Sequence, residues 1–471
     1  MSPLGTETRP AVVAVALVLL VVATAGPVPA AAATTASPSG AAETATATQG
    51  ENVLTFTHAF ERLPDREGTV RVTVETAVPD SVTGVSVSPP DGADVVETTG
   101  YEQTTDGTWT WDGAASAVDR PTITYVADVD RRDEGTLEAT STGDWALFNW
   151  RTADVAWRYS RRANAPEPAV VERGEPVGEG VVGPGYAYLG PYETETRTVD
   201  GETIRLVVPA ATDMVSSPDA VADALAGASD DLRVGARNER LTVFVAPAPI
   251  DAPGRLSRAQ VDGRQDMYVG ADRPLETADN AWFHEYVHSR QAYEAGSGMR
   301  WFDDASAEYY AARLASEGGH VSEAAFVEYV RTDETNDAVL GESRSVTDRA
   351  SYFKGMRVLA ALDVEVREAS GGDRTLQDVF AAVNAHDGTV TDETFATLVE
   401  ETVGEPRDEW LATYVGTDAT PTVPDSVAET TTTERPTRGM LEPEGQAAPL
   451  VGALLFAGAL AVVGGLRLHR R

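Results

Sequence analysis

Residues 282–288 contain the pattern H-E-x-x-H, in which His284 and His288 stand four residues apart. On a helix this spacing places both imidazoles on one face, one turn apart, where they can hold a single Zn²⁺. Glu285, between them, can act as general base on a metal-activated water. The stretch therefore predicts two metal ligands and a base for hydrolysis.

A third ligand is expected from residues 301–310, which offer carboxylates on the next predicted helix. Asp304 and Glu308 stand four residues apart, and this spacing places both on the same helical face. Aspartate is one methylene shorter than glutamate, so a helix that uses Asp304 must approach the metal more closely. The spacing alone leaves both residues open as the third ligand.

The charge of the chain is strongly negative: 471 residues include 74 acidic and 37 basic ones, for a formal net charge of −37. This balance excludes nucleic acid as a partner. Lys354 is the only lysine, and an acidic, lysine-poor surface is typical of proteins from salt-loving microbes, where concentrated salt screens self-repulsion. A disordered acidic protein is the alternative, but apolar periodicity continues along the chain.

The sequence has no cysteine. Disulfides, thiolate metal sites and a cysteine nucleophile are therefore excluded, which leaves histidine and carboxylates as metal ligands. The remaining histidines have no ligand-like neighbours in the sequence, and we expect surface or structural roles for them: His58, His320, His386 and His469.

Two apolar segments predict the location of the protein. Residues 1–33 have an apolar run followed by small residues, which indicates a secretory signal peptide, with an uncleaved anchor as the alternative. Residues 450–466 form a second apolar run, long enough for a transmembrane helix. The arginines in 467–471 predict a cytoplasmic tail, and hence a single-pass cell-membrane protein with its catalytic domain extracellular. A buried core helix is the alternative for the second run.

Composition divides the remaining chain into four parts. Residues 34–50 predict a disordered linker, and residues 51–160 a β-rich domain, because short alternating runs are separated there by Gly, Pro and Asp. Residues 161–416 contain the metal motif and form the predicted catalytic domain. Residues 417–449, rich in Thr, Pro and Glu, predict a linker before the membrane segment.

The catalytic region changes from strands to helices along the chain. Ser217-Pro218-Asp219 is a helix start with proline in the first turn. Residues 241–246 predict a buried strand and residues 266–270 an edge strand, after which the chain is mainly helical to about residue 415. A small sheet followed by the metal-site helix and a helical lobe is an α+β arrangement.

Residues 301–310 resemble the W-x-x-E-G-x-x-x-Y-Y element of gluzincin metallopeptidases, namely the glycyl aminopeptidase-like family and, more distantly, the membrane alanyl aminopeptidases. In these families the glutamate before the glycine is the third zinc ligand. Alignment on Trp301 and Tyr309-Tyr310 places Asp304 at that position, followed by Ala305 in place of glycine. The resemblance thus favours Asp304, with Glu308 as the alternative.

Tyr352-Phe353-Lys354-Gly355 resembles the Y-x-K-G element of the same families. There the tyrosine donates a hydrogen bond to the developing oxyanion, so the resemblance implies this role for Tyr352; a surface or helix-capping Tyr-Lys pair is the alternative. The resemblance covers residues 275–420 and implies a thermolysin-like zincin catalytic domain with a helical C-terminal lobe. The family element that binds a substrate amino terminus has no clear equivalent, and Asp266-Met267-Tyr268-Val269 occupies roughly its place.

The first functional hypothesis is a zinc-dependent peptidase at the cell surface that hydrolyses peptide or protein substrates as an aminopeptidase or an endopeptidase. The second is a membrane-anchored surface binding or structural protein with a degenerate peptidase fold. This second hypothesis is based on two features: Asp304-Ala305 replaces the Glu-Gly of the family pattern, and the element that binds a substrate amino terminus has no clear equivalent.

Overall fold

The computed structural model describes residues 52–332, 338–342 and 348–429. The expected signal peptide, the linker at 34–50 and the apolar run at 450–466 lie outside these residues. Among the helices that are described, none is both long and apolar enough to cross a membrane.

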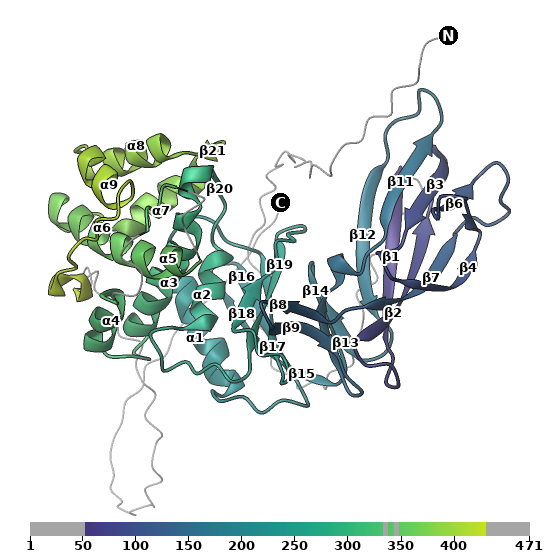
Figure 1. The fold of residues 1–471 in the computed structure, drawn as a ribbon, viewed down its shortest axis with the longest axis horizontal. Helices are drawn as coiled ribbons and strands as arrows, with labels where there is room; N and C mark the ends of the chain where they lie inside the picture. The colour runs from purple at the N-terminus through teal and green to yellow at the C-terminus, as the bar shows by residue number, and fades with distance from the viewer. Residues whose placement is uncertain (1–51, 333–337, 343–347, 430–471) are drawn as a thin grey trace, which may run out of the picture. The chain divides into compact units, whose positions relative to one another are not determined.

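Strands build the N-terminal part (Figure 1). In β1 (Val53–Arg62) every second side chain is buried, so one face packs inward, as the period of two predicts. A five-stranded sheet has the order β12 (Ala169–Pro176), β1, β2 (Thr69–Ala77), β7 (Thr122–Asp128), β4 (Asp94–Thr99). A second sheet has the order β11 (Ala156–Arg161), β3 (Val82–Ser88), β6 (Trp109–Asp112), β5 (Glu102–Gln103).

A third sheet continues the β-rich part. Its order is β13 (Gly180–Val182), β14 (Tyr186–Leu189), β10 (Ala146–Asn149), β9 (Thr136–Ser141), β8 (Arg131–Asp133). The expected boundary at residue 160 falls inside β11, and β12 beyond it pairs in parallel with β1. The first N-terminal sheet therefore contains strands from both sides of residue 160.

The fourth sheet supports the metal-motif helix. Its order is β15 (Tyr192–Val199), β16 (Glu202–Pro209), β17 (Arg240–Ala246), β19 (Arg264–Gly270), β18 (Gly254–Leu256). Strand β17 is almost wholly buried, which confirms the predicted buried strand. Helix α1 (Pro218–Asp231) begins as predicted, because the Ser217 side chain accepts a hydrogen bond from the Ala220 backbone N–H.

The predicted edge strand at residues 266–270 was wrong. It forms most of β19, which pairs with β17 on one side and β18 on the other. The strand can be internal because its polar residue, Asp266, is fully buried and accepts backbone hydrogen bonds from Gly185 and Tyr186. The edge beside the metal-motif helix is β18, so Asp266-Met267-Tyr268-Val269 does not lie on it.

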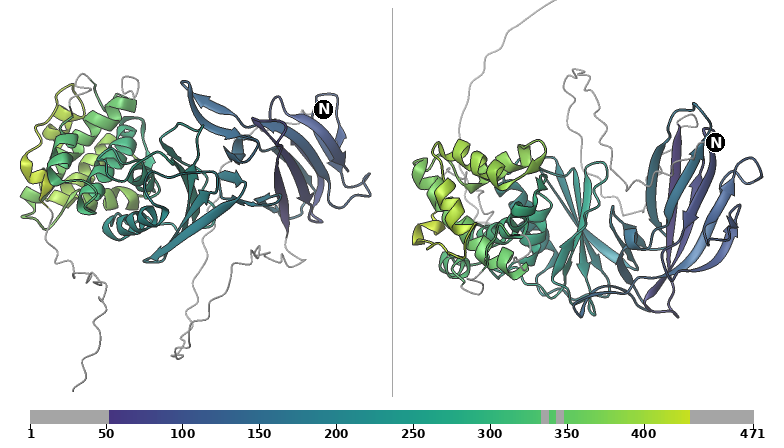
Figure 2. Two further views of the ribbon diagram at one scale, coloured as in Figure 1. Left: turned by 90° about the horizontal axis from the view of Figure 1, so that it is seen from below. Right: turned by 45° about the horizontal axis from the view of Figure 1, so that its top comes forward.

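Helices follow the sheet, as expected, and Figure 2 shows them gathered together. They are α2 (Ala281–His288), α3 (Trp301–Glu317), α4 (Glu323–Val330), α5 (Asp348–Ala350), a π-helical turn (Ser351–Gly355), α6 (Met356–Ala369), α7 (Leu376–Ala385), α8 (Asp392–Val403) and α9 (Asp408–Tyr414). A short parallel pair joins β20 (Glu294–Ala295) to β21 (Thr389–Val390). The chain is thus a mixed α/β protein with a β-rich N-terminal part and a helical C-terminal part.

The expected linker from residue 417 was wrong for its described part. Val423 and Val427 are fully buried in the helical core, four residues apart. The guanidinium of Arg367 donates hydrogen bonds to the carbonyl oxygens of Ser426 and Val427. Apolar burial and charged donors to the backbone therefore hold residues up to 429, although their composition resembles that of a tether.

Candidate metal centre

Helix α2 carries the H-E-x-x-H pattern and is fixed at its start. The Asn280 side chain accepts a hydrogen bond from the Phe283 N–H and donates one to the Leu275 carbonyl oxygen. Later in the helix, the Tyr286 hydroxyl donates to buried Glu202 at 2.8 Å and accepts from Arg290 at 2.7 Å. The face opposite the two histidines is therefore anchored to the sheet.

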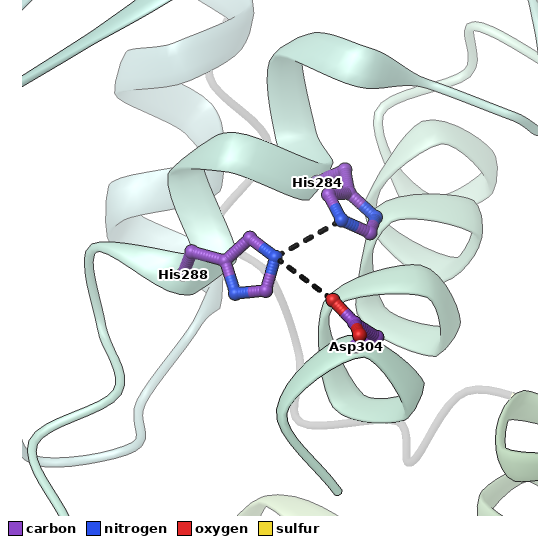
Figure 3. Close-up of side chains that lie close together, drawn as sticks. All are labelled: His284, His288 and Asp304. Carbon is purple, nitrogen blue, oxygen red and sulfur yellow. Dashed lines mark hydrogen bonds and ion pairs between the residues drawn. The ribbon is translucent and has the colours of Figure 1, made fainter. Parts of the chain in front are cut away.

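Three predicted ligands converge between α2 and α3 (Figure 3). The Nε2 atoms of His284 and His288 lie 3.0 Å apart, and Asp304 Oδ1 lies 3.7 Å from His288 Nε2. One ligand atom from each residue falls within a cluster no wider than 4.8 Å. Two imidazoles and a carboxylate are a donor set that zinc uses in proteins.

Glu308 does not converge with them; its Oε2 lies 2.7 Å from the other ring nitrogen of His284, Nδ1. The Tyr329 hydroxyl donates to Oε1 of the same carboxylate. An imidazole whose Nδ1–H donates to a carboxylate presents its Nε2 lone pair outward. Glu308 thus orients His284 from behind.

Gln291 supports His288 in the same way. His288 Nδ1 lies 2.9 Å from Gln291 Oε1, and the amide Nε2 donates to the Asp303 carbonyl oxygen and to Ser306 Oγ. With both amide donors used on α3, the oxygen faces His288, whose Nδ1 must then carry the proton. In their neutral forms, both histidines therefore point lone pairs at one another across 3.0 Å, which is favourable only with a shared proton or a cation between them.

The pKa values of the two histidines are shifted in opposite directions. Burial would lower the pKa of His284, but the hydrogen bond and charge of Glu308 raise it to about 9. Burial, followed by the positive charge of His284, lowers the pKa of His288 to about 3. His284 is thus the more basic of the two histidines, and His288 stays neutral.

Glu285 lies beneath the edge strand β18. A side chain on Gly254 would come within 2.9 Å of Glu285 Cγ, so the glycine makes room for the glutamate. The Leu256 backbone also makes a hydrogen bond to the Glu285 carboxylate. Burial raises the pKa of Glu285 to about 7, a value suited to a base that works near neutrality.

Tyr352 stands against the first histidine. Its ring stacks on His284 with centroids 5.1 Å apart and planes inclined by 4°. The π-helical turn that carries it approaches α3 closely, because a side chain on Gly355 would come within 2.6 Å of the Ala305 Cβ. Two small residues therefore permit the contact between this turn and the site.

Lys354 has a structural position. It is buried, and its Nζ donates hydrogen bonds to the carbonyl oxygens of Ala338 and Thr417. The alternative of a surface Tyr-Lys pair is therefore wrong for the lysine, which connects the π-helical turn to two neighbouring loops.

The structure gathers the predicted residues His284, Glu285, His288, Asp304 and Tyr352 at one place. Glu308 is adjacent but engaged with the back of His284. Sequence reasoning missed three further contributors, Gln291, Tyr329 and Gly254. Gln291 had a local signal, since it follows His288 by three residues; Tyr329 and Gly254 come from distant elements and had none.

Solved structures share this fold. An aminopeptidase N family protein from Idiomarina loihiensis matches with a TM-score of 0.55 and 13% identity, over 78% of this chain and 77% of that one. Two structures of an M1 zinc metallopeptidase from Deinococcus radiodurans, one of them a variant, have TM-scores of 0.49 and 0.48. Each is 14% identical over 79% of this chain and 95% of its own. No protein-family model and no curated protein matches the sequence.

At 13% identity the likeness concerns the fold, and the TM-score of 0.55 applies to about three quarters of both chains. The matched 78% of this chain extends well beyond residues 275–420, the segment that carries the motif resemblance. The chain has the fold of an aminopeptidase N family protein, which confirms at the level of fold the resemblance to gluzincin metallopeptidases.

Proposed function

We propose that this protein is a zinc-dependent peptidase. The observation that carries the proposal is the convergence of His284, His288 and Asp304 beside Glu285, which is buried beneath an edge strand. The donor set fits zinc. The Nδ1 atoms of both histidines, which face away from the ligand cluster, are held by Glu308 and Gln291.

The three converging residues hold the metal in this proposal. A zinc ion there supplies a Lewis acid that polarises a carbonyl group and lowers the pKa of water. Asp304 is the third ligand, and its short side chain is matched by the close packing of α3 on α2. Glu308 retains its hydrogen bond to His284 and raises the basicity of that ligand.

Glu285 is the general base. Its carboxylate, with a pKa of about 7 caused by burial, takes a proton from the attacking water and returns it to the leaving amine. Tyr352, which is stacked on His284, donates a hydrogen bond from its phenolic O–H to the carbonyl oxygen as negative charge develops there. These roles complete a thermolysin-like mechanism of peptide hydrolysis.

The location belongs to the same proposal and is supported by the sequence alone. Residues 1–33 direct export, and residues 450–466 anchor the chain with residues 467–471 in the cytoplasm. The peptidase would then face outward on the cell surface, with a surface exposed to concentrated salt.

The decisive experiment is Glu285→Gln, assayed in concentrated salt for bound zinc and for hydrolysis of a quenched-fluorescence peptide library. Zinc should remain stoichiometric while turnover falls by about 10²- to 10⁴-fold, the usual contribution of a general base. Glu294→Gln, at an exposed position of β20, is the matched control.

Undiminished turnover in Glu285→Gln would overturn the mechanism. Zinc well below stoichiometry in the metal-replete wild type would favour the alternative, a surface binding protein with a degenerate peptidase fold. Comparing free with amino-blocked peptides separates an aminopeptidase from an endopeptidase.

A further inference from the structure

The strand above Glu285 has an edge that a substrate can use. Among the described residues, β18 pairs with β19 alone and ends the fourth sheet. An extended peptide can add to such an edge through main-chain hydrogen bonds, and side chains on alternate residues then set specificity. The residues of β18 are Gly254, Arg255 and Leu256.

The hydrogen bonds around β18 show which backbone groups face that edge. Ser257 N–H donates to the Asp266 carbonyl oxygen, and the Pro253 carbonyl oxygen accepts from Gly270 N–H. In an antiparallel pair these directions alternate, so the backbone groups of Gly254 and Leu256 point away from β19. The hydrogen bond from the Leu256 backbone to Glu285 agrees with this orientation.

Side chains on β18 alternate between two faces. A side chain at Gly254 would point at Glu285, so the Arg255 side chain lies on the opposite face. That face carries its strand partner Tyr268 and contacts β9, where the Arg255 guanidinium forms an ion pair with Glu138. Arg255 is therefore one residue from the general base along the strand, but outside its pocket.

Arg255 keeps capacity for a further anion. Its side chain is 54% exposed, whereas that of Glu138 is 10% exposed and also lies 3.5 Å from the Nε of Arg131. Asp133, 3.8 Å from Arg255, is 64% exposed and solvated. A guanidinium has five N–H donors, and its contact with Glu138 is made by one of the terminal nitrogens.

We infer that Arg255 is a specificity-determining residue that favours substrates with an acidic side chain at the position across from it on the edge of β18. A peptide residue directly opposite Arg255 places its side chain on the same face, with the two Cβ atoms about 5 Å apart. Opposite charges in such a pair attract, and a lysine there is repelled. The inference rests on the proposed peptidase function and names the substrate class of that site.

The size of the effect follows from cross-strand pairs. An opposite-charge pair at this exposure changes kcat/KM by about two- to fivefold relative to a neutral side chain. The preference should weaken as salt rises, because an exposed pair is screened. The expected order of substrates at this position is therefore Glu, then Gln, then Lys.

The test uses full-length protein loaded with zinc and a peptide series in which Glu, Gln or Lys replaces each residue in turn on both sides of the scissile bond. Wild type should prefer Glu at one position by about two- to fivefold. Arg255→Gln should remove the preference there, and Arg255→Glu should invert it to favour Lys. Arg131→Gln is the control, because it removes the other cationic partner of Glu138 without changing the edge strand.

The outcomes separate the two proposals. Failure of wild type to cleave any peptide sinks the peptidase function itself. Cleavage with equal kcat/KM for Glu, Gln and Lys at every position overturns the role of Arg255 alone. An equal loss of preference in Arg131→Gln also overturns it, since the effect would then come from Glu138; unchanged circular dichroism in each variant secures the comparison.

Discussion

Two buried histidines in this molecule face carboxylates, one in the helical part and one in the β-rich part. His284 on α2 lies 2.7 Å from Glu308, and His58 on β1 lies 3.3 Å from Asp154. Both rings are buried and in contact with other aromatic rings. By residue type and burial alone, the two pairs are nearly equivalent.

The two pairs differ in how the ring nitrogens of the histidine are used. His284 uses Nδ1 on Glu308 and aims Nε2 at His288, whereas neither ring nitrogen of His58 makes a hydrogen bond to any described residue. Burial lowers the pKa of His58 to about 3 and raises that of Asp154 to about 7, so both are largely uncharged in mildly acidic solution. The difference lies in the second ring nitrogen: Nε2 of His284 meets two further candidate ligands, His288 and Asp304, whereas no such group of residues forms around His58 among the described residues.

The largest expected effect is loss of the metal when one converging ligand is removed. Asp304→Ala should reduce bound zinc from stoichiometric to trace and abolish hydrolysis, because two histidines alone hold zinc weakly. His58→Leu, which removes the other buried histidine, should leave zinc content and kcat unchanged. Metal analysis by plasma mass spectrometry after dialysis measures both; full zinc in Asp304→Ala would transfer the ligand role to Glu308.

The next effect concerns the support behind the first ligand. Glu308→Gln keeps an acceptor for His284 but removes the charge, and should weaken zinc affinity by about 10- to 100-fold while retaining one site. Competition with a chromophoric chelator gives the affinity. An unchanged dissociation constant would show that the 2.7 Å hydrogen bond does not act on the metal.

A smaller fall in zinc affinity is expected when the partner of His288 is changed. Gln291→Leu removes the acceptor for His288 Nδ1 and both donors to α3. Because the lost partner is an uncharged amide, the fall in zinc affinity should lie near tenfold, about the lower end for such partners. The same chelator titration applies, and a loss larger than that of Glu308→Gln would reverse the ranking of the two supports.

The last comparison concerns stability and leaves the metal site unchanged: it is a pair of opposed pH dependences in the β-rich part. In Asp154→Asn, His58 remains with a folded pKa of about 3 against 6.5, so the unfolded state binds more protons and the free energy of unfolding rises with pH in that window. In His58→Leu, Asp154 remains with a folded pKa of about 7 against 3.8, and the free energy of unfolding falls as pH rises between those values.

Each slope is at most about 1.4 kcal/mol per pH unit relative to wild type, where the two partly cancel. Denaturant titrations at several pH values measure the slopes. Parallel curves for both variants and wild type would show that burial shifts neither group.

Sequence spacing could predict the site residues that lie close together along one helix. It could not predict those whose positions depend on the packing of distant elements. The spacing of His284 and His288 fixes their common helical face whatever the fold. Asp304 and Glu308 also share one face, so spacing could not assign them; the approach of α3 to α2 places one at the cluster and the other behind His284.

Strand β18 was missed because its sequence offers no signal. Pro253 and Gly254 indicate a turn, and three residues are too few for periodicity. Its strand conformation comes from pairing with β19, which is visible only in three dimensions. The edge placement of residues 266–270 was wrong for a related reason: the backbone N–H groups of Gly185 and Tyr186 satisfy the buried Asp266, and nothing in the sequence shows that contact.

Residues 417–429, which pack against the helical part, determine where the protein can be shortened for expression. A recombinant form that ends at residue 416 would leave the sites of Val423 and Val427 empty and deprive Arg313, Arg331 and Arg367 of their carbonyl acceptors. Such a form should aggregate or be degraded. One that ends after residue 429 keeps these contacts and omits the apolar run at 450–466, in a form suited to metal analysis and crystallisation.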